Sequence, residues 1–144
     1  MASYRRPGFF MRTIAGTFMS ALVKAGFSPR GANILEVRGR ASGQPRQVPV
    51  NPLTVDGVTY LVAPRGDTHW VRNIRAAGEA RLIRGRRARA IRVVELPDAE
   101  KPPLLREYLR RWHRETSRQF NLTEHASDAE LAAAAPGHPV FRVL

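Results

Sequence analysis

The sequence predicts a mainly β protein, a small one-domain β-barrel with helices at its sides. Five or six short, β-branched segments follow one another with tight turns between them. These segments do not alternate regularly with long helices, so a doubly wound parallel sheet is not expected. A length of 144 residues suits one domain with its own core. We expect that domain to span residues 1–144, with a helical segment at 1–30 and the barrel at 33–144.

The first predicted element is a helix from Met11 to Phe27, in which apolar side chains recur every fourth residue. Lys24 ends the apolar stretch well short of the ~20 residues that a membrane span needs. We therefore expect a cytoplasmic protein without a membrane-spanning segment. Three basic residues precede the helix and leave weak association with an anionic membrane surface open: Arg5, Arg6 and Arg12.

The next segments have strand character. Asn33–Arg38 alternates around apolar residues, and Arg46–Ala63 is expected to be a β-hairpin with the turn pair Asp56-Gly57. Pro49 and Pro52 lie in the first arm of this hairpin. Because proline donates no ladder hydrogen bond, that arm should lie at a sheet edge or be kinked.

A short helix is expected from about Thr68 to Ala77, ended by Gly78. Two strands follow at Ala80–Ile83 and Ala90–Leu96, joined through a turn that contains a glycine.

The second half of the chain contains the longest predicted helix, over residues 99–117, with acidic residues at its start and arginines near its end. For residues 118–137 the sequence indicates only a short alanine-rich helix capped by Ser127. His138–Leu144 is expected to be the final strand.

The charge is concentrated in one part of the chain. Residues 1–94 hold 17 basic and 4 acidic residues, whereas residues 95–144 hold 7 and 8. Nearly all the basic residues are arginines, whose planar fork matches phosphate and carboxylate. The first two-thirds of the chain can therefore bind an anion, although an arginine-rich solvated surface explains the same pattern.

The absence of cysteine excludes disulfides, thiol nucleophiles and thiolate metal sites. Any redox chemistry must then come from a bound cofactor. The histidines show no ligand spacing, so no metal site is expected; they are His69, His113, His125 and His138. The glycine-rich phosphate loops of the classical nucleotide-binding folds are also missing.

Two stretches carry most of the chemical information. The first, GRASGQPRQVPVN from Gly39 to Asn51, is a Gly/Ser/Pro turn with an arginine at each end, which suits an anion but also describes a plain polar hairpin. The second, from Tyr60 to Arg75, runs from a strand through Pro-Arg-Gly into a helix start. Trp70 and Asn73 follow there on one helix face, where they can contact a ligand or belong to the core.

The order of these motifs, G-R-x-S-G-x-x-R-x-x-P and then L-V-A-P-R-G-x-x-x-W-x-x-N, resembles the deazaflavin-dependent nitroreductase family. The resemblance covers roughly residues 34–112. It implies a split β-barrel of the FMN-binding type, with an N-terminal helix, a short mid-chain helix and a longer helix in the C-terminal half. It also implies an oxidoreductase that uses coenzyme F420, an 8-hydroxy-5-deazaflavin with a phosphate and polyglutamyl tail, with FMN as the less favoured cofactor.

The resemblance also implies which residues hold the cofactor. The residues expected to bind the anionic tail are Arg40, Ser42, Gly43 and Arg46. One wall of the ring site is expected to consist of Val48, Pro49, Val50 and Asn51. The opposite wall, and the residues that close it, are expected to be Val62, Ala63, Pro64, Arg65, Gly66, His69, Trp70 and Asn73. The chain departs from the family pattern at Ala41, where a basic residue is common, and at Asn51, near a common tyrosine.

The expected reaction is hydride transfer from reduced F420 to an electron-poor acceptor: an activated alkene, a quinone or a nitroaromatic. No residue stands out as the catalytic acid; the candidate proton donors are Tyr4, Ser20, Asn51 and His69. The N-terminal helix either covers the substrate side, which would suit a lipophilic acceptor, or packs entirely on the barrel. The sequence leaves the oligomeric state open.

Two other functions stay open at this point. A basic strand pair can track nucleic-acid phosphates, and its arginines are Arg81, Arg84, Arg86, Arg87, Arg89 and Arg92. The region lacks interleaved aromatic residues and any helix-turn-helix or zinc motif, so no specific nucleic acid is expected. The same barrel can also carry FMN or a lipid.

Overall fold

The computed structural model describes residues 33–144, and within residues 113–118 it describes only the backbone. The predicted helix Met11–Phe27 and the segment 1–30 lie outside the described residues. The expected division of the chain into domains therefore stays a prediction.

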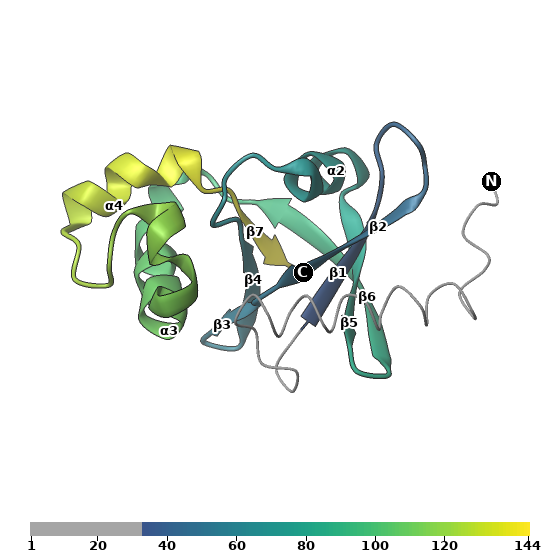
Figure 1. The fold of residues 1–144 in the computed structure, drawn as a ribbon, viewed down its shortest axis with the longest axis horizontal. Helices are drawn as coiled ribbons and strands as arrows, with labels where there is room; N and C mark the ends of the chain where they lie inside the picture. Colours follow the sequence, from purple (N-terminus) through teal and green to yellow (C-terminus); the bar gives the residue numbers. More distant parts are fainter. Residues whose placement is uncertain (1–32) are drawn as a thin grey trace.

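Seven strands form one antiparallel sheet in the order β2-β1-β5-β6-β7-β4-β3 (Figure 1). The strands are β1 (Asn33–Arg38), β2 (Pro45–Val50), β3 (Leu53–Val55), β4 (Val58–Val62), β5 (Glu79–Arg84), β6 (Arg87–Glu95) and β7 (Val140–Val143). The predicted mainly β fold is confirmed. The sheet curves into half of a barrel because β6 is shared: residues 87–92 pair with β5, and residues 93–95 pair with β7.

The predicted hairpin over Arg46–Ala63 is only partly correct. Its first arm divides at Asn51 and Pro52 into β2, which pairs with β1, and β3, which pairs with β4. Pro52 has no N–H and disfavours helical backbone in the residue before it, so the chain leaves the first ladder there. The two halves become the two edges of the sheet, as the prolines predicted.

The turn between β3 and β4 has the geometry that its sequence demands. Asp56 and Gly57 have φ of 51° and 79°. Positive φ at both central residues is the requirement of the two-residue hairpin turn that an Asp-Gly pair favours.

The helices follow the predicted order with small shifts at their ends. They are α2 (His69–Ala77), the 3-10 turn η1 (Asp98–Glu100), α3 (Pro102–Phe120), α4 (Asp128–Ala134) and the 3-10 turn η2 (Ala135–Gly137). The predicted helix over 99–117 thus begins with a separate 3-10 turn. Ser127 caps α4 as expected, because its hydroxyl accepts from the Glu130 N–H and the Glu130 carboxylate accepts from the Ser127 N–H.

The sheet separates two hydrophobic cores. Leu61 and Phe141 face the core that α2 covers, whereas their neighbours Val62 and Val140 face the core formed with α3 and α4. This follows from the alternation of side chains along a strand. Figure 1 shows α3 and α4 beside each other beyond β3 and β4, with α2 separate from them.

Candidate functional site

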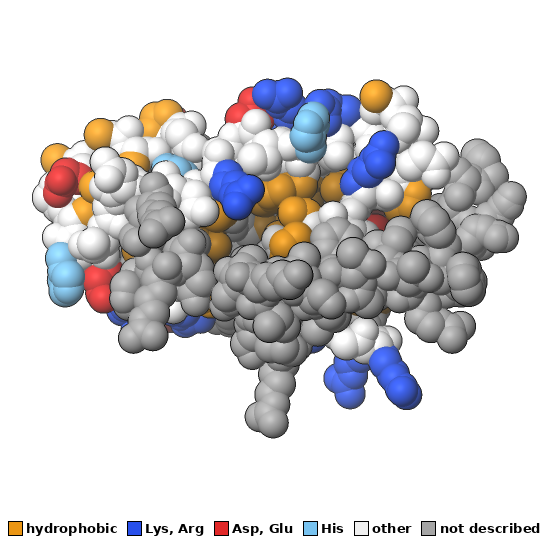
Figure 2. All heavy atoms as spheres, viewed as in Figure 1, with side chains coloured by type: hydrophobic (Ala, Val, Ile, Leu, Met, Phe, Trp, Pro, Cys, Tyr) orange, Lys and Arg blue, Asp and Glu red, His pale blue; other side chains and the backbone are white. Residues whose placement is uncertain are grey.

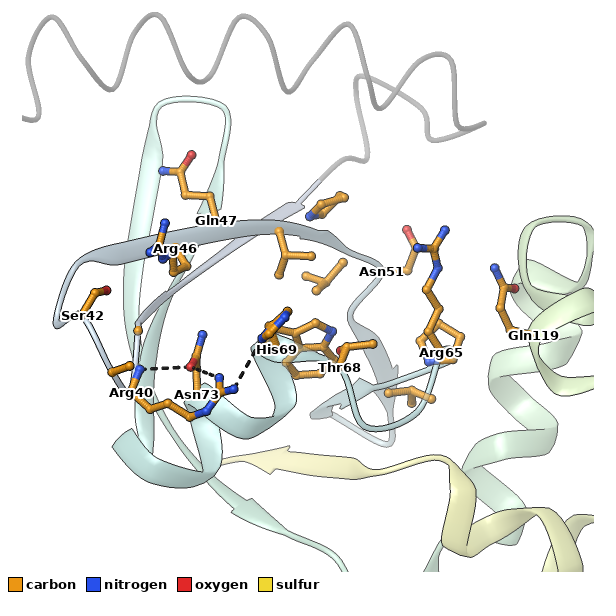
Figure 3. Close-up of a pocket in the computed structure, with 18 of the residues that line it drawn as sticks. Arg40, Ser42, Arg46, Gln47, Asn51, Arg65, Thr68, His69, Asn73 and Gln119 are labelled. Carbon is orange, nitrogen blue, oxygen red and sulfur yellow. Dashed lines mark hydrogen bonds between the residues drawn. The ribbon is translucent and has the colours of Figure 1, made fainter.

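A cavity of about 800 Å³ lies between β2, the β4–α2 connection and α2 (Figure 3). Residues from both sequence motifs line it. Of the residues predicted to hold a cofactor, those on its wall are Arg40, Ser42, Arg46, Val48, Pro49, Val50, Asn51, Val62, Pro64, Arg65, His69, Trp70 and Asn73. The fold thus brings together two stretches that are separated by a strand pair in the sequence.

Three of the predicted residues are not on the cavity wall. Ala63 is buried in the core under α2. Gly66 lies in the connection behind the wall, where its φ is 83° and a Cβ atom would come within 2.9 Å of the Gly137 carbonyl oxygen. Gly43 has φ of 74° at the tip of the β1–β2 loop. These residues shape the backbone of the site rather than its surface.

Six further residues of the wall were not predicted from the sequence: Gly39, Ala41, Gln47, Thr68, Tyr108 and Gln119. The first four are neighbours of predicted residues, so wider motif boundaries would have included them. Tyr108 and Gln119 come from α3, and no local pattern ties that helix to the motifs.

Apolar side chains form the middle of the cavity. Val48, Pro49 and Val50 come from β2, and the half-buried Trp70 comes from the first turn of α2. The Trp70 ring packs against Phe141 with 5.9 Å between centroids, so the core beneath it holds the indole in place. Figure 2 shows apolar side chains at the base of a hollow, with basic side chains on both sides of it.

One end of the cavity is the β1–β2 loop, which carries Arg40, Ser42 and Arg46. Backbone bonds close this loop: the Gly39 N–H donates to the Gln44 carbonyl at 2.8 Å, and the Gly43 N–H donates to the Gly39 carbonyl at 2.9 Å. Arg46 makes no hydrogen bond or ion pair with any of the residues that the structure describes, and its side chain is exposed on the cavity wall.

Arg40 lies across the loop end and is bound to α2. The buried side chain of Asn73 accepts from the Arg40 backbone N–H at 3.0 Å and from Arg40 Nη1 at 2.7 Å. Arg40 Nη2 lies 3.5 Å from His69 Nδ1. These contacts tie the loop to the helix.

The other end of the cavity is polar. It consists of Arg65 on the β4–α2 connection, Asn51 directly after β2, and Gln119 on α3 (Figure 3). Arg65 is exposed and has no ion pair within the described part of the chain. This end therefore offers hydrogen-bond donors that solvent and small molecules can reach.

The β4–α2 connection is supported from behind by His138. Its Nδ1 lies 3.3 Å from the Ala63 carbonyl oxygen, and its ring stacks on Phe120 with 4.0 Å between centroids. Burial lowers the pKa of His138, so the neutral imidazole is favoured, and it donates to the Ala63 carbonyl. The wall of the cavity thus depends on a neutral histidine outside it.

Within residues 33–144, no three metal-ligating side chains lie together. No helix in that described range is long and apolar enough to cross a membrane.

The class of protein follows from the sheet and is supported by solved structures. An F420-H2 dependent reductase (FDR-A) is 20% identical with a TM-score of 0.54, over 80% of this chain and 95% of that one. PhzG from Burkholderia lata 383 is 15% identical with a TM-score of 0.53, over 99% and 80%. A pyridoxamine 5′-phosphate oxidase homologue from Listeria innocua is 9% identical with a TM-score of 0.53, over 91% and 92%. The fold is the split β-barrel of the FMN-binding type.

The sequence itself identifies the family. Residues 10–125 match the model of the F420H(2)-dependent quinone reductases, and the chain belongs to this family. It is an oxidoreductase, and its cofactor is coenzyme F420. No curated protein matches the sequence.

The residues present fit this cofactor. A deazaflavin ring is flat and largely apolar, and the middle of the cavity offers Trp70 on one side and the apolar part of β2 on the other. The tail is anionic, and Arg46 at the loop end has no competing carboxylate among the described residues.

Proposed function

We propose that this reductase binds F420 in the cavity between β2 and α2 and reduces an electron-poor small molecule, with quinones as the first class to test. The observation that carries the proposal is the order in which charged, apolar and hydrogen-bonding side chains follow one another along the cavity. Anion-binding arginine, apolar walls and a second set of donors follow one another from the loop end to the end at Arg65.

In this arrangement the loop end holds the anionic tail. Ser42 and Arg46 lie on the cavity wall, and their loop is already closed by its own backbone hydrogen bonds. A preformed loop loses little conformational entropy when a ligand binds. The apolar walls hold the ring, with Val48–Val50 on one side and Trp70 on the other.

F420 in its reduced form supplies the hydride. The chain's own contribution is to orient the acceptor and to stabilise negative charge on it. Arg65 and Asn51 donate hydrogen bonds at the far end, where a quinone oxygen would gain negative charge. Asn51 and His69 stay candidate proton donors, whereas the other two candidates, Tyr4 and Ser20, lie outside the described residues.

The proposal extends to where the protein acts. We place the enzyme in the cytoplasm, with at most weak contact to a membrane surface. Because a quinone is lipophilic, such contact would bring the enzyme close to its acceptor. The expectation that the helix at 11–27 covers the substrate side stays a prediction.

The first experiment is a binding panel of F420, FMN and FAD, measured by fluorescence or absorbance titration. We expect saturable binding of F420 and much weaker binding of the two flavins. Preferential binding of FMN would instead favour the flavin-carrier alternative, and DNA binding that persists at physiological salt, without F420 binding, would favour the nucleic-acid alternative.

The second experiment follows F420H2 oxidation with a soluble quinone, an activated enone and a nitroaromatic compound. We expect the highest kcat/KM with the quinone. Equal or higher values with either of the other acceptors would contradict the quinone assignment but leave the reductase assignment intact.

A further inference from the structure

The side-chain amide of Asn73 has only one allowed orientation. Its accepting atom receives the Arg40 backbone N–H at 3.0 Å and Arg40 Nη1 at 2.7 Å. Both partners can only donate, so the accepting atom must be the oxygen Oδ1. The reverse orientation would place the Nδ2 donors against the Arg40 donors.

The nitrogen of the same amide is consequently directed elsewhere. The hydrogen bonds of the Asn73 side chain within the described part of the chain all go to Oδ1, so Nδ2 has no partner there, and Asn73 lines the cavity. Figure 3 shows the amide nitrogen pointing away from Arg40, toward the strand that carries Arg46. Two N–H donors on a nearly buried side chain therefore face the ligand space.

The same arginine fixes a second group on α2. Arg40 Nη2 lies 3.5 Å from His69 Nδ1, and a guanidinium nitrogen can only donate. A hydrogen bond at this contact requires Nδ1 to accept, which corresponds to the tautomer with its proton on Nε2. His69 and Asn73 are four residues apart on α2 and share one face of the helix, so both line the cavity.

We propose that Arg40 is a positioning residue that makes the α2 wall of the cavity a surface of donors only, formed by Asn73 Nδ2–H and His69 Nε2–H. The ligand group seated there must then offer only acceptors, as a ring carbonyl or a phosphate does. This inference rests on the proposed function for the identity of the ligand. Arg40 then acts on the ligand through Asn73 and His69, and Arg46 is the arginine of the loop that contacts the anion directly.

The sharpest variant is Asn73→Asp. The carboxylate keeps an acceptor for both Arg40 donors, so the melting temperature should hold, but the donors toward the ligand are lost. We expect F420 affinity to fall by about tenfold or more, as for loss of a hydrogen bond with an acceptor left unpaired. Arg72→Gln is the matched control, because it changes the charge of the same helix by the same amount on an exposed side chain; its affinity should stay within about twofold.

Two ligands separate the sources of the acceptor group. If the ring carbonyls face α2, Asn73→Asp weakens both F420 and its deazaflavin chromophore without the phosphate tail. If the phosphate faces α2, only F420 binding is weakened. Unchanged affinity for both ligands in a folded Asn73→Asp variant would overturn the proposal.

Nitrogen NMR of His69 provides a readout that needs no cofactor. At a pH where histidine is deprotonated, we expect the wild-type His69 ring to carry its proton on Nε2, with Nδ1 as the acceptor, and Arg40→Met to give a mixture of both tautomers. A wild-type imidazole protonated on Nδ1 would contradict the inference even if Asn73→Asp failed to fold. If the wild-type protein did not bind F420, the proposed function would fail while the tautomer measurement still decided the role of Arg40.

Discussion

The two ends of the cavity are built in opposite ways. At the loop end, backbone hydrogen bonds close the β1–β2 turn, and Arg40 ties it to the buried Asn73. At the far end, Arg65 is exposed and has no ion pair within the described residues. A fixed end suits a ligand that is the same in every turnover, and an adaptable end suits acceptors that differ in shape. The difference supports our proposal that the cofactor binds at the loop end and the acceptor at the far end.

The largest expected effect comes from the wall between the two ends. Trp70→Ala removes the aromatic surface from the ring site and its packing against Phe141. We expect F420 affinity to fall by about 100-fold, since a buried aromatic contact of about 3 kcal/mol is lost. Isothermal titration calorimetry measures it, with Trp70→Phe as the control that keeps a flat ring. Equal affinity in both variants would mean that the ring does not lie against α2.

At the loop end, Arg46→Ala should weaken F420 binding by about tenfold and leave the melting temperature nearly unchanged. A charge-assisted hydrogen bond contributes about 1.5–3 kcal/mol, and Arg46 makes no described contact that supports the fold. Fluorescence titration gives the affinity, and Arg87→Ala, an exposed arginine on β6, is the charge control. The same loss in both variants would show a general charge effect rather than a tail contact.

At the far end, Arg65→Gln should lower kcat/KM for a quinone by about fivefold and leave the Kd of F420 within about twofold. The side chain is exposed, so we expect about 1 kcal/mol from its charge. Steady-state assays with two acceptors of different size measure it. If instead cofactor affinity fell and kcat/KM for the acceptor did not, the two ends would have the reverse roles.

The smallest effect concerns the support of the β4–α2 connection. Burial lowers the pKa of His138 from its ordinary 6.5, so the folded state binds fewer protons than the unfolded state just below that pH. Stability should therefore fall as the pH decreases from 7 to below about 6.5. Thermal melts across this range measure it, and His138→Gln should flatten the dependence. A melting temperature that rises on acidification would contradict the assignment of a neutral His138.

The strands, the β3–β4 turn and the helix cap could be predicted from the sequence because each depends on residues close together in the chain. Alternating residues, the Asp56-Gly57 turn and the Ser127 cap each act within a few positions, and all appear as expected. The division of the first hairpin arm was not predicted, although Pro52 marks it. A proline can end a strand or merely lie at its edge, and only the pairing with β1 or β4 decides between these outcomes.

The candidate site shows the same limit. Most of its wall could be predicted because the motif residues follow one another along the chain. The contribution of α3, through Tyr108 and Gln119, depends on the packing of the second core against the sheet. The bond between Arg40 and Asn73 also spans 33 positions and has no local signal.

The position of β7 has a consequence for synthesis on the ribosome. When residues up to the end of β6 have emerged, two separate ladders can form, β2-β1-β5-β6 and β3-β4, but no strand pairing joins them. Among residues 33–144, only Val140–Val143, 45 positions later, pairs with both β6 and β4. Until then the free edges of β4 and of the last part of β6 are open to pairing with other chains. The nascent protein is thus most prone to aggregate late in translation, and factors that shield strand edges at that stage should raise its yield more than those that act early.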